Sequence, residues 1–187
     1  MMLVNHCRDK YSFQLTMGGI KPTLMKSVLA AIILLVGAPA ALAADCTASA
    51  APKVDWQRCY MDGRGFIGDD LTQARLRETS FQRSDLSGAN LTKVDAYRVR
   101  FISAGLKGAK LDDGLFAEAD FTKADLTGAS MVRTDLRRAR FFHASLKGAD
   151  LTGAKILGAD LLNADLSGAR WTDGSHICAE GSLGQCN

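Results

Sequence analysis

Histidine is scarce in this 187-residue chain, and none of its five cysteines lies in the long regular segment at its centre. Only three histidines are present, and two of them, His143 and His176, lie beyond residue 44. The sequence contains no CxxC motif, no grouping of serine, cysteine or histidine that indicates an activated nucleophile, and no glycine-rich phosphate loop. We therefore expect no enzyme activity, no catalytic residue, no metal site and no cofactor.

The chain also lacks a hydrophobic run long enough to remain in a membrane. Its most apolar stretch, residues 28–36, is too short for about 30 Å of hydrocarbon. Lys26 precedes this stretch and an A-x-A pattern at 41–43 follows it, as in a cleaved signal peptide. The sequence thus predicts an exported protein, periplasmic or secreted, cleaved near Ala43/Ala44 and without a stable transmembrane segment in its mature form. An uncleaved membrane anchor is the alternative.

Residues 1–24 show no periodicity and fit neither the signal peptide nor the folded part. Either translation begins later than Met1, at Met17 or Met25, or the charged region before the apolar stretch is unusually long. In both cases we expect residues 1–24 to be absent from the folded protein.

The centre of the sequence repeats every five residues without an insertion or deletion. Counted in fives from Phe66 to Trp171, 21 of 22 residues are large and apolar, and Ala96 is the exception. The residue two positions before each of these centres is alanine in 14 of the 22 quintets. Neither the 3.6-residue period of a helix nor the two-residue period of a strand produces this pattern. It indicates a solenoid whose units bury their apolar side chains by stacking on each other.

The repeated letters carry a family resemblance. The segments ADFTKADLTGA (119–129) and ADLLNADLSGA (159–169) match the pattern A-(D/N)-L-x-x, and on these residues the chain resembles the pentapeptide-repeat family. The resemblance covers 66–171. It implies an all-β fold, a right-handed quadrilateral parallel β-helix in which four quintets form one square coil. The 22 quintets would make about 5.5 coils, whose sides we name the Phe66, Leu71, Leu76 and Phe81 sides.

A 20-residue superperiod supports the four sides independently. Glycine stands two residues after every centre on the Phe66 side, but at only two of 16 such positions on the other sides. We expect a corner there with a positive φ angle that favours glycine alone. On the Phe81 side, stacked coils should place four phenylalanines about 4.8 Å apart as an internal aromatic ladder. Its members are Phe81, Phe101, Phe121 and Phe141.

Four cysteines follow the expected cleavage site, two before the repeat and two after it. An even, terminal set in an exported chain indicates disulfides. The pairing Cys46–Cys59 and Cys178–Cys186 closes two short loops, and a solenoid needs such closure because its terminal coils otherwise expose core and unpaired edges. The expected organisation is residues 1–24 outside the fold, a signal peptide over 25–43, an N-terminal disulfide cap over 44–63, the repeat over 64–173 and a C-terminal disulfide cap over 174–187.

The register itself extends into the N-terminal cap. Trp56 and Met61 are in phase with the large centres, and Val54 and Cys59 are in phase with the small residues before them. The β-helix is therefore expected to begin near Val54, with Trp56 covering the end of the core.

Many aspartates occupy the position before a centre. We interpret them as hydrogen-bonding side chains that repeat along the stack, because repetition explains them better than acid–base catalysis does. The set is Asp85, Asp95, Asp120, Asp125, Asp135, Asp150, Asp160 and Asp165.

Binding must then be sought among the outward residues. Isolated apolar residues on a surface are ordinary, whereas clustered ones often mark a partner site. The candidate interaction patch, on the Leu76 and Phe81 sides, is Tyr97, Ile102, Arg137, Arg138, Arg140, Phe142, Leu157 and Leu162. An ordinary surface without a partner is the alternative.

Two functions follow. The first is a protein-interaction or structural scaffold with an unknown protein partner or a homodimer. The second is a module that binds an anionic envelope surface or a polyanionic glycan through its basic sides. The family that the chain resembles includes DNA mimics that protect topoisomerases through a strongly acidic surface. With 23 Lys and Arg residues against 20 Asp and Glu residues, this chain lacks such a surface, and we expect no nucleic-acid binding.

Overall fold

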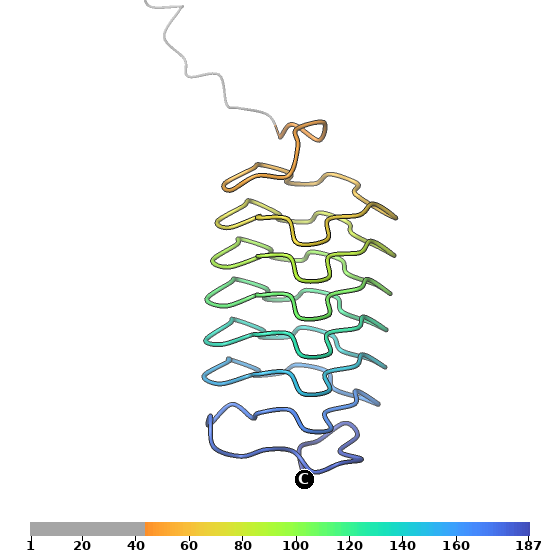
Figure 1. Ribbon diagram of the computed structural model, residues 1–187, viewed down its shortest axis with the longest axis vertical. Helices are drawn as coiled ribbons and strands as arrows, with labels where there is room; N and C mark the ends of the chain where they lie inside the picture. The colour runs from red at the N-terminus through yellow and green to blue at the C-terminus, as the bar shows by residue number, and fades with distance from the viewer. Residues whose placement is uncertain (1–43) are drawn as a thin grey trace, which may run out of the picture. The chain divides into compact units, whose positions relative to one another are not determined.

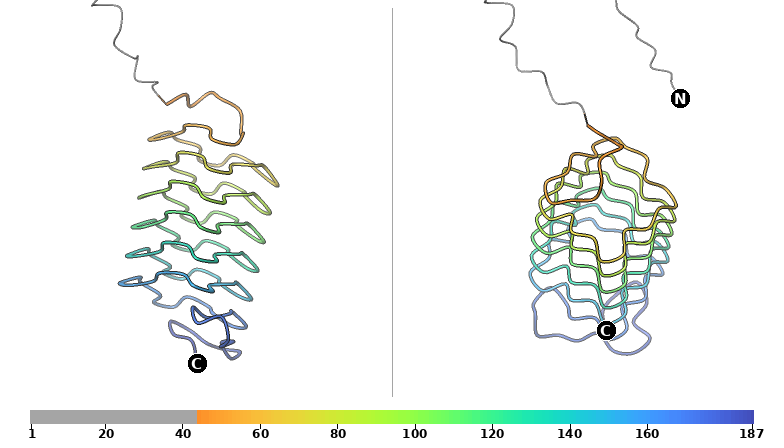
Figure 2. Two further views of the ribbon diagram at one scale, coloured as in Figure 1. Left: turned by 90° about the vertical axis from the view of Figure 1, so that its left-hand side faces the viewer. Right: turned by 45° about the horizontal axis from the view of Figure 1, so that its top comes forward.

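The computed structural model describes residues 44–187, so the segments 1–24 and 25–43 discussed above lie outside the described residues. Residues 44–187 contain no helix and no extended strand, and hence no helix that could cross a bilayer. Instead, single-residue parallel bridges join positions 20 apart, from Asp55↔Arg75 to Asp150↔Arg170. Figure 1 shows the resulting coils stacked one above another, and Figure 2 shows them from two further directions. The fold is a right-handed quadrilateral parallel β-helix, and its bridges begin inside the segment 44–63.

Four backbone hydrogen bonds recur in each quintet, and three of them explain why five residues make one side. The centre donates to the coil that follows, as Leu76 N does to Asp95 O at 2.7 Å. The residue before it donates to the preceding coil, as Arg75 N does to Val54 O at 2.9 Å. A turn closes on itself, as Ala74 N does on Leu71 O at 3.0 Å. Each side is thus one short paired segment followed by one β-turn.

The expectation that only glycine adopts a positive φ angle at the corners is wrong. Every corner is left-handed: Gly68, Gly88 and their equivalents have φ of 62° to 70°, but Arg98 (56°), Glu118 (58°) and Arg138 (58°) are no different. A type II turn needs positive φ at its third residue, whatever that residue is. The strain on non-glycine residues is offset by a backbone bond, such as Arg98 N to Ala117 O at 3.1 Å. The structure places nothing within 4 Å of a Cβ built at Gly88 or Gly128, so it does not explain the glycine column.

The large centres and the small residues before them form one continuous core. Along the Phe81 side the rings of Phe81, Phe101, Phe121 and Phe141 stack with centroids 5.3, 5.3 and 5.0 Å apart and interplanar angles of 13°, 14° and 4°. The fit is tight beside them, since a Cβ on Gly114 would lie 2.4 Å from Phe116 Cε2. The quintet pattern therefore sets side-chain volume as well as direction.

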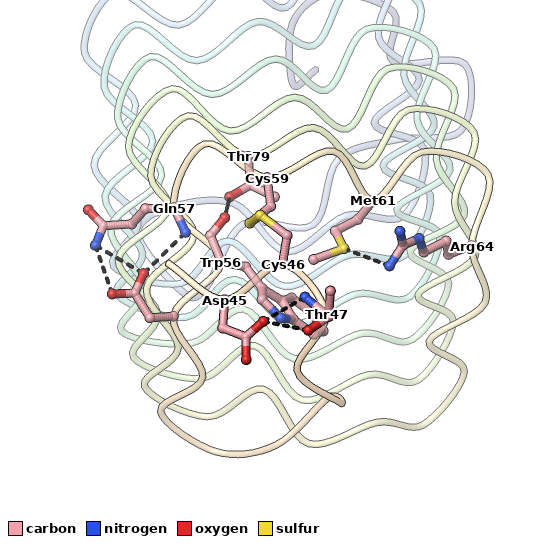
Figure 3. Close-up of a disulfide and its surroundings, with 10 residues drawn as sticks. Asp45, Cys46, Thr47, Trp56, Gln57, Cys59, Met61, Arg64 and Thr79 are labelled. Carbon is pink, nitrogen blue, oxygen red and sulfur yellow. Dashed lines mark hydrogen bonds between the residues drawn. A yellow bond between two sulfur atoms is a disulfide. The ribbon is translucent and has the colours of Figure 1, made fainter. Parts of the chain in front are cut away.

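At the N-terminal end, the indole of Trp56 lies across the first coil. It is 1% exposed, and its centroid is 5.4 Å from that of Phe66 and 6.3 Å from that of Phe81. Cys46 and Cys59 are joined by a disulfide, which holds the loop 44–52 beside Trp56 (Figure 3). The cap thus combines a covalent tie with a large apolar lid.

At the C-terminal end, the chain turns back on itself and leaves the coil. Antiparallel bridges pair Arg170 with Ile177 on the Leu71 side and Asp165 with Leu183 on the Phe66 side. A disulfide joins Cys178 to Cys186 within this returning segment. The bridges therefore pair the cap with two sides of the last coil, and Gly184 also lies against the Phe81 side, where a Cβ on it would be 3.5 Å from Leu161 O.

Candidate functional site

The Leu76 side carries a concavity of about 450 Å³ that contains half of the predicted interaction patch. Residues from four successive coils line it, because positions 20 apart in sequence are neighbours on one side. They are Tyr97, Ala117, Glu118, Arg137, Arg138, Leu157 and Gly158. Leu157 at its lower border is 80% exposed, the highest value among the large apolar residues that the structure describes as exposed.

Tyr97 is held in position by two arginines. The guanidinium carbons of Arg77 and Arg98 lie 5.0 and 4.8 Å from the centroid of its ring. Cation–π contacts of this kind contribute about 0.5–1 kcal/mol each at exposed sites. The half-buried ring is therefore fixed at one end of the concavity, and the exposed side chain of Leu157 lies at the other.

The structure does not bring the rest of the predicted patch into this concavity. Phe142 and Leu162 lie on neighbouring coils of the Phe81 side, where Leu162 is 58% exposed and Phe142 is half-buried with its ring 4.3 Å from that of His143. Ile102 is two coils away on the same side, with Thr122 between. Arg140 lines a second concavity of about 650 Å³ together with Arg98, Arg100, Glu118, Asp120 and Arg138. The predicted patch is thus two groups and one outlying residue.

Most of the basic groups here are already paired with carboxylates. Glu118 lies between Arg98, at 2.8 Å, and Arg138, at 3.8 Å. The hydrogen bond from Arg98 lowers the pKa of Glu118 below its ordinary value, and the same contact raises the pKa of Arg98. These pairs follow the solenoid axis from coil to coil. They leave little unpaired positive charge on the Leu76 side.

The Phe81 side is less fully paired: of Arg83, Arg100, Lys123 and Arg140, only Arg140 has a carboxylate within 4 Å among the described residues. Arg140 donates to the Asp120 carboxylate at 2.6 Å, and Arg137, on the neighbouring side, donates to Asp135 at 2.6 Å. The bond from Arg137 lowers the pKa of Asp135. Arg100 has no carboxylate within 4 Å among residues 44–187, and its guanidinium carbon lies 5.9 Å from the Tyr60 ring centroid. The sequence count of basic residues therefore overstates the free positive charge on the Leu76 side, whereas most of the positive charge on the Phe81 side is unpaired among the described residues.

The aspartates before the centres hydrogen-bond mostly within their own turn, and the bonds expected along the stack come from basic side chains, as from Arg140 to Asp120 at 2.6 Å. The Oδ1 atom of Asp85 accepts from Ser87 N at 3.0 Å and from Ser87 Oγ at 2.6 Å, and Asp150 does the same with Thr152. These bonds fix the entry to each turn, and the serine hydroxyl lowers the pKa of Asp85. Contacts between coils are made instead to basic side chains, such as Lys107 to Asp125 at 3.2 Å.

Exposed apolar side chains gather at the C-terminal end, where the sequence analysis identified Leu157 and Leu162 but not Ile177 and Leu183. Of seven large apolar residues that are exposed, four belong to the last coil or its cap: Leu157, Leu162, Ile177 and Leu183. The only sequence signal was two aliphatic residues in an otherwise polar, glycine-rich tail. Among residues 44–187, no three of the side chains of His, Cys, Asp and Glu are grouped closely enough to hold a metal ion.

The repeat matches the profile of a known protein family. A family profile described as Pentapeptide repeats matches eight copies within residues 70–106, 100–138 and 134–170. The curated proteins that were compared include no match.

Several solved structures are similar. One is HetL from the cyanobacterium Nostoc sp. Strain PCC 7120, described as a pentapeptide repeat protein involved in heterocyst differentiation regulation. It is 28% identical over 66% of this chain and 68% of its own, with a TM-score of 0.41. A pentapeptide repeat protein from the Arabidopsis thaliana thylakoid lumen is 21% identical over 66% and 83% of the two chains, with a TM-score of 0.43. QnrB1, described as a plasmid-mediated fluoroquinolone resistance protein, is 19% identical over 63% and 65%, with a TM-score of 0.30.

Proposed function

Because this chain belongs to the pentapeptide-repeat family of β-helical scaffolds, we propose that it is a non-enzymatic, exported scaffold that binds a protein partner. The observation that carries this proposal is the concavity on the Leu76 side, in which Tyr97 is fixed by arginines and Leu157 is 80% exposed. Buried aromatic and arginine side chains next to an apolar residue are typical of the centres of protein interfaces. The core offers no room for a substrate, since it is filled by the centres of every coil.

Export is part of the proposal. Disulfides persist in oxidising compartments, and the structure joins the four cysteines of the described residues in two pairs. A mature protein that begins near Ala44, in the periplasm or outside the cell, fits this chemistry. Mass spectrometry of the protein from its native host should find that N-terminus, and peptides containing Cys7 from the folded protein would contradict it.

On the Leu76 side, where the concavity lies, ion pairing favours the protein-binding function over binding to an anionic surface. Electrostatic attraction to a polyanion depends on unneutralised positive charge, whereas Arg98, Arg138 and Arg140 each contact a carboxylate. The mixed charge of these sides also speaks against mimicry of DNA.

The test is site-specific photocrosslinking in the native host. A photoreactive residue at position 157 should give a discrete adduct with a protein, and one at Ile67, which is 67% exposed near the other end, should not. Replacement of Tyr97 by alanine should weaken the adduct at 157. Equal crosslinking at both positions, or adducts formed only with lipid or glycan and lost between low and high salt, would contradict the proposal.

A further inference from the structure

The corner between the Leu76 and Phe81 sides carries a groove that runs along the solenoid axis. Its wider part is the concavity of about 650 Å³ lined by Arg98, Arg100, Glu118, Asp120, Arg138 and Arg140. A further concavity of about 500 Å³ continues it toward the N-terminal end and is lined by Arg58, Tyr60, Glu78, Arg98 and Arg100. Because the two concavities share Arg98 and Arg100, they form one groove that spans five coils.

Charge alternates along this groove with a period of two coils. We call the two outward residues that one coil places at this corner a rung. In chain order the rungs are Arg58 and Tyr60, Glu78 and Ser80, Arg98 and Arg100, Glu118 and Asp120, and Arg138 and Arg140. The rungs that carry arginine therefore lie two coils apart, or about 9.6 Å. A rung that carries acidic side chains separates each from the next.

Arg100, at the middle of the groove, is the arginine that the fold leaves unpaired. Of the five arginines that line the groove, it alone has no carboxylate within 4 Å in residues 44–187. The reason is the residue one coil earlier: Arg140 meets Asp120 there, whereas Arg100 meets Ser80. The Ser80 hydroxyl already donates to Asp62 Oδ1 at 2.6 Å. The half-buried Arg100 is thus available to a carboxylate from outside the chain.

The other arginines of the groove keep donors free although they are paired. A guanidinium has five N–H donors, and Arg98 uses its Nε–H for Glu118, at 2.8 Å. Arg138 approaches Glu118 only to 3.8 Å, which is too far for a hydrogen bond. The carboxylates of the chain therefore reduce the charge of the groove but leave N–H groups for the oxygen atoms of a ligand.

We propose that this groove binds an acidic protein segment in the polyproline II conformation, with a carboxylate at every third residue. Such a segment has three residues per turn and a rise of about 3.1 Å per residue, so its carboxylates recur at intervals of about 9.3 Å. This interval matches the spacing of about 9.6 Å between the rungs that carry arginine. Residues on one face of an extended strand recur at about 6.7 Å, and an α-helical turn is about 5.4 Å, so neither matches the rungs.

The length of the groove and its aromatic end fit the same segment. Four coil rises, about 19 Å, separate the rung of Arg58 from that of Arg138, and two polyproline II turns measure about 18.6 Å. Tyr60 is 70% exposed at the first rung, and the Arg100 guanidinium carbon lies 5.9 Å from the centroid of its ring. Aromatic side chains that line grooves are the usual contacts of proline-rich segments. We therefore expect a core of about seven residues, with acidic side chains at its first, fourth and seventh positions.

The acidic rungs disfavour a uniformly charged polymer. Successive phosphates of a DNA strand are about 3.4 Å apart along the axis, so some would lie beside Glu78, Glu118 and Asp120. A glycan with a carboxylate on every sugar meets the same repulsion between like charges. A polyproline II segment instead places uncharged residues at these rungs.

Titration of the purified, disulfide-bonded protein with a peptide of four Pro-Pro-Glu triplets, followed by calorimetry in about 0.15 M salt, tests the proposal. We expect saturable binding. A peptide of the same composition with its four glutamates consecutive should bind at least about fivefold more weakly, because its carboxylates do not reach successive arginine rungs. Polygalacturonate, which carries a carboxylate on every sugar, should bind more weakly than the triplet peptide.

Two arginine variants locate the site. Arg100→Ala should weaken binding of the triplet peptide at least about tenfold, since hydrogen bonds to charged groups are the strong ones. Arg83→Ala removes an exposed arginine from the same side that also has no carboxylate within 4 Å in the described part of the chain. Because it lies outside the groove and salt screens distant charges, this control should change binding by less than about twofold.

A third variant leaves Arg100 in place and gives it a partner. Ser80→Asp combined with Asp62→Asn supplies the carboxylate that Arg140 has in Asp120, and binding should weaken while circular dichroism stays unchanged. Arg100 does not line the concavity that contains Leu157, so this titration and photocrosslinking at position 157 can fail separately.

Four results would overturn the proposal. They are the absence of binding at millimolar peptide, equal binding of the two peptides, equal effects of Arg100→Ala and Arg83→Ala, and tighter binding of polygalacturonate than of the triplet peptide. The last would identify the groove as a site for an acidic glycan.

Discussion

The two ends of the solenoid cover the apolar core of their terminal coils in different ways. At the N-terminal end, the indole of Trp56 covers the first coil, and the centres Met61, Phe66 and Leu71 are at most 7% exposed. At the C-terminal end, a returning segment pairs with half of the last coil and leaves Ile156 partly exposed. Each end has one disulfide that closes a short loop, with separations of 13 and 8 residues. Covalent closure alone therefore does not decide whether an end of the core is covered.

Backbone pairing does not distinguish the ends either. The outward amides of Tyr60, Gly65 and Asp70 on the first coil have no protein acceptor among the described residues, as is also true at the last coil. What differs is the cover over apolar side chains, since burial of a large side chain contributes about 1.5–3 kcal/mol. The apolar core is thus covered at the N-terminal end and partly exposed at the C-terminal end.

An interior substitution provides the reference for both ends and should have the largest effect. Phe121 stacks between Phe101 and Phe141, with centroids 5.3 and 5.0 Å away. We expect Phe121→Ala to lower the free energy of unfolding by about 3–5 kcal/mol, because the coils on both sides prevent the cavity from collapsing. Thr122→Ala, on the outward neighbour, should change it by less than about 0.5 kcal/mol. Urea titration measures both, and equal effects would show that the register is wrong.

Replacement of each terminal tryptophan by alanine tests directly whether the two ends are covered to different extents. Trp56→Ala removes a lid that contacts the Phe66 and Phe81 rings, and we expect a loss of about 3 kcal/mol. Trp171 is only partly buried, so Trp171→Ala should cost about 1 kcal/mol. Urea titrations of the two variants should therefore differ in midpoint. A larger loss for Trp171→Ala would reverse our assignment of the covered end.

A matched control separates packing from the indole N–H. The Trp56 Nε1 atom is buried and has no hydrogen-bond partner among the described residues. Leaving such a donor unpaired costs about 1–3 kcal/mol. Trp56→Phe should therefore retain most of the stability that Trp56→Ala loses.

The difference between the ends also marks how far the sequence could predict the structure. The pattern of large and small residues predicted the family, the coil and its four sides, because each quintet repeats the same local physics. Leu157 was predicted as outward, but its neighbours in the concavity come from coils about 20, 40 and 60 residues earlier along the chain. The ion pairs of Arg138 and Arg140 depend on side-chain directions that a count of charges does not contain.

Two further features could not be predicted from the five-residue repeat. The positive φ of Arg98 and Glu118 could not be inferred, because their residue types do not favour it. The path of the C-terminal cap could not be inferred either, since residues 174–187 have no period. Apolar residues in a segment without a period, such as Leu183, give no indication of which side they cover.

Removal of the disulfides one at a time tests the same comparison, and we expect each removal to cause a loss of stability of intermediate size. Loop-closure entropy for these separations gives about 2–3 kcal/mol for each bond. Thermal melts of Cys46→Ser/Cys59→Ser and of Cys178→Ser/Cys186→Ser should thus show similar losses. Local exchange should differ: the first variant should expose Trp56, and the second should release only the sides paired with residues 177 and 183. Non-reducing peptide maps should find these two links and no free thiol, and a Cys46–Cys186 link would contradict both ends.

Acid should produce the smallest effect, and should act on the turns of both caps before the coils between them. At the N-terminal end the Thr47 hydroxyl lowers the pKa of Asp45, and at the C-terminal end the backbone N–H groups of His176 and Ser175 lower the pKa of Asp173. Because each pKa is lower in the folded protein than in the unfolded chain, the stabilisation is complete above the unfolded value, near 3.9, and is lost as the pH falls through the folded value.

We therefore expect amide protection in both caps to fall below about pH 4 while the Phe121 coil stays protected. Asp173→Asn keeps an Oδ1 acceptor for the N–H groups of Ser175 and His176, which lie 2.8 and 2.9 Å from it, but it cannot gain a proton. This variant should be less protected than the wild type at pH 7 and should lose little more at pH 3, and Asp45→Asn should do the same for the first cap only. NMR exchange measured against pH decides the matter, because both aspartates are at the surface and the change in melting temperature will be small. A coil interior that loses protection before the caps would show that the aspartates of the repeat whose pKa is also lowered, such as Asp85 and Asp135, govern the acid response.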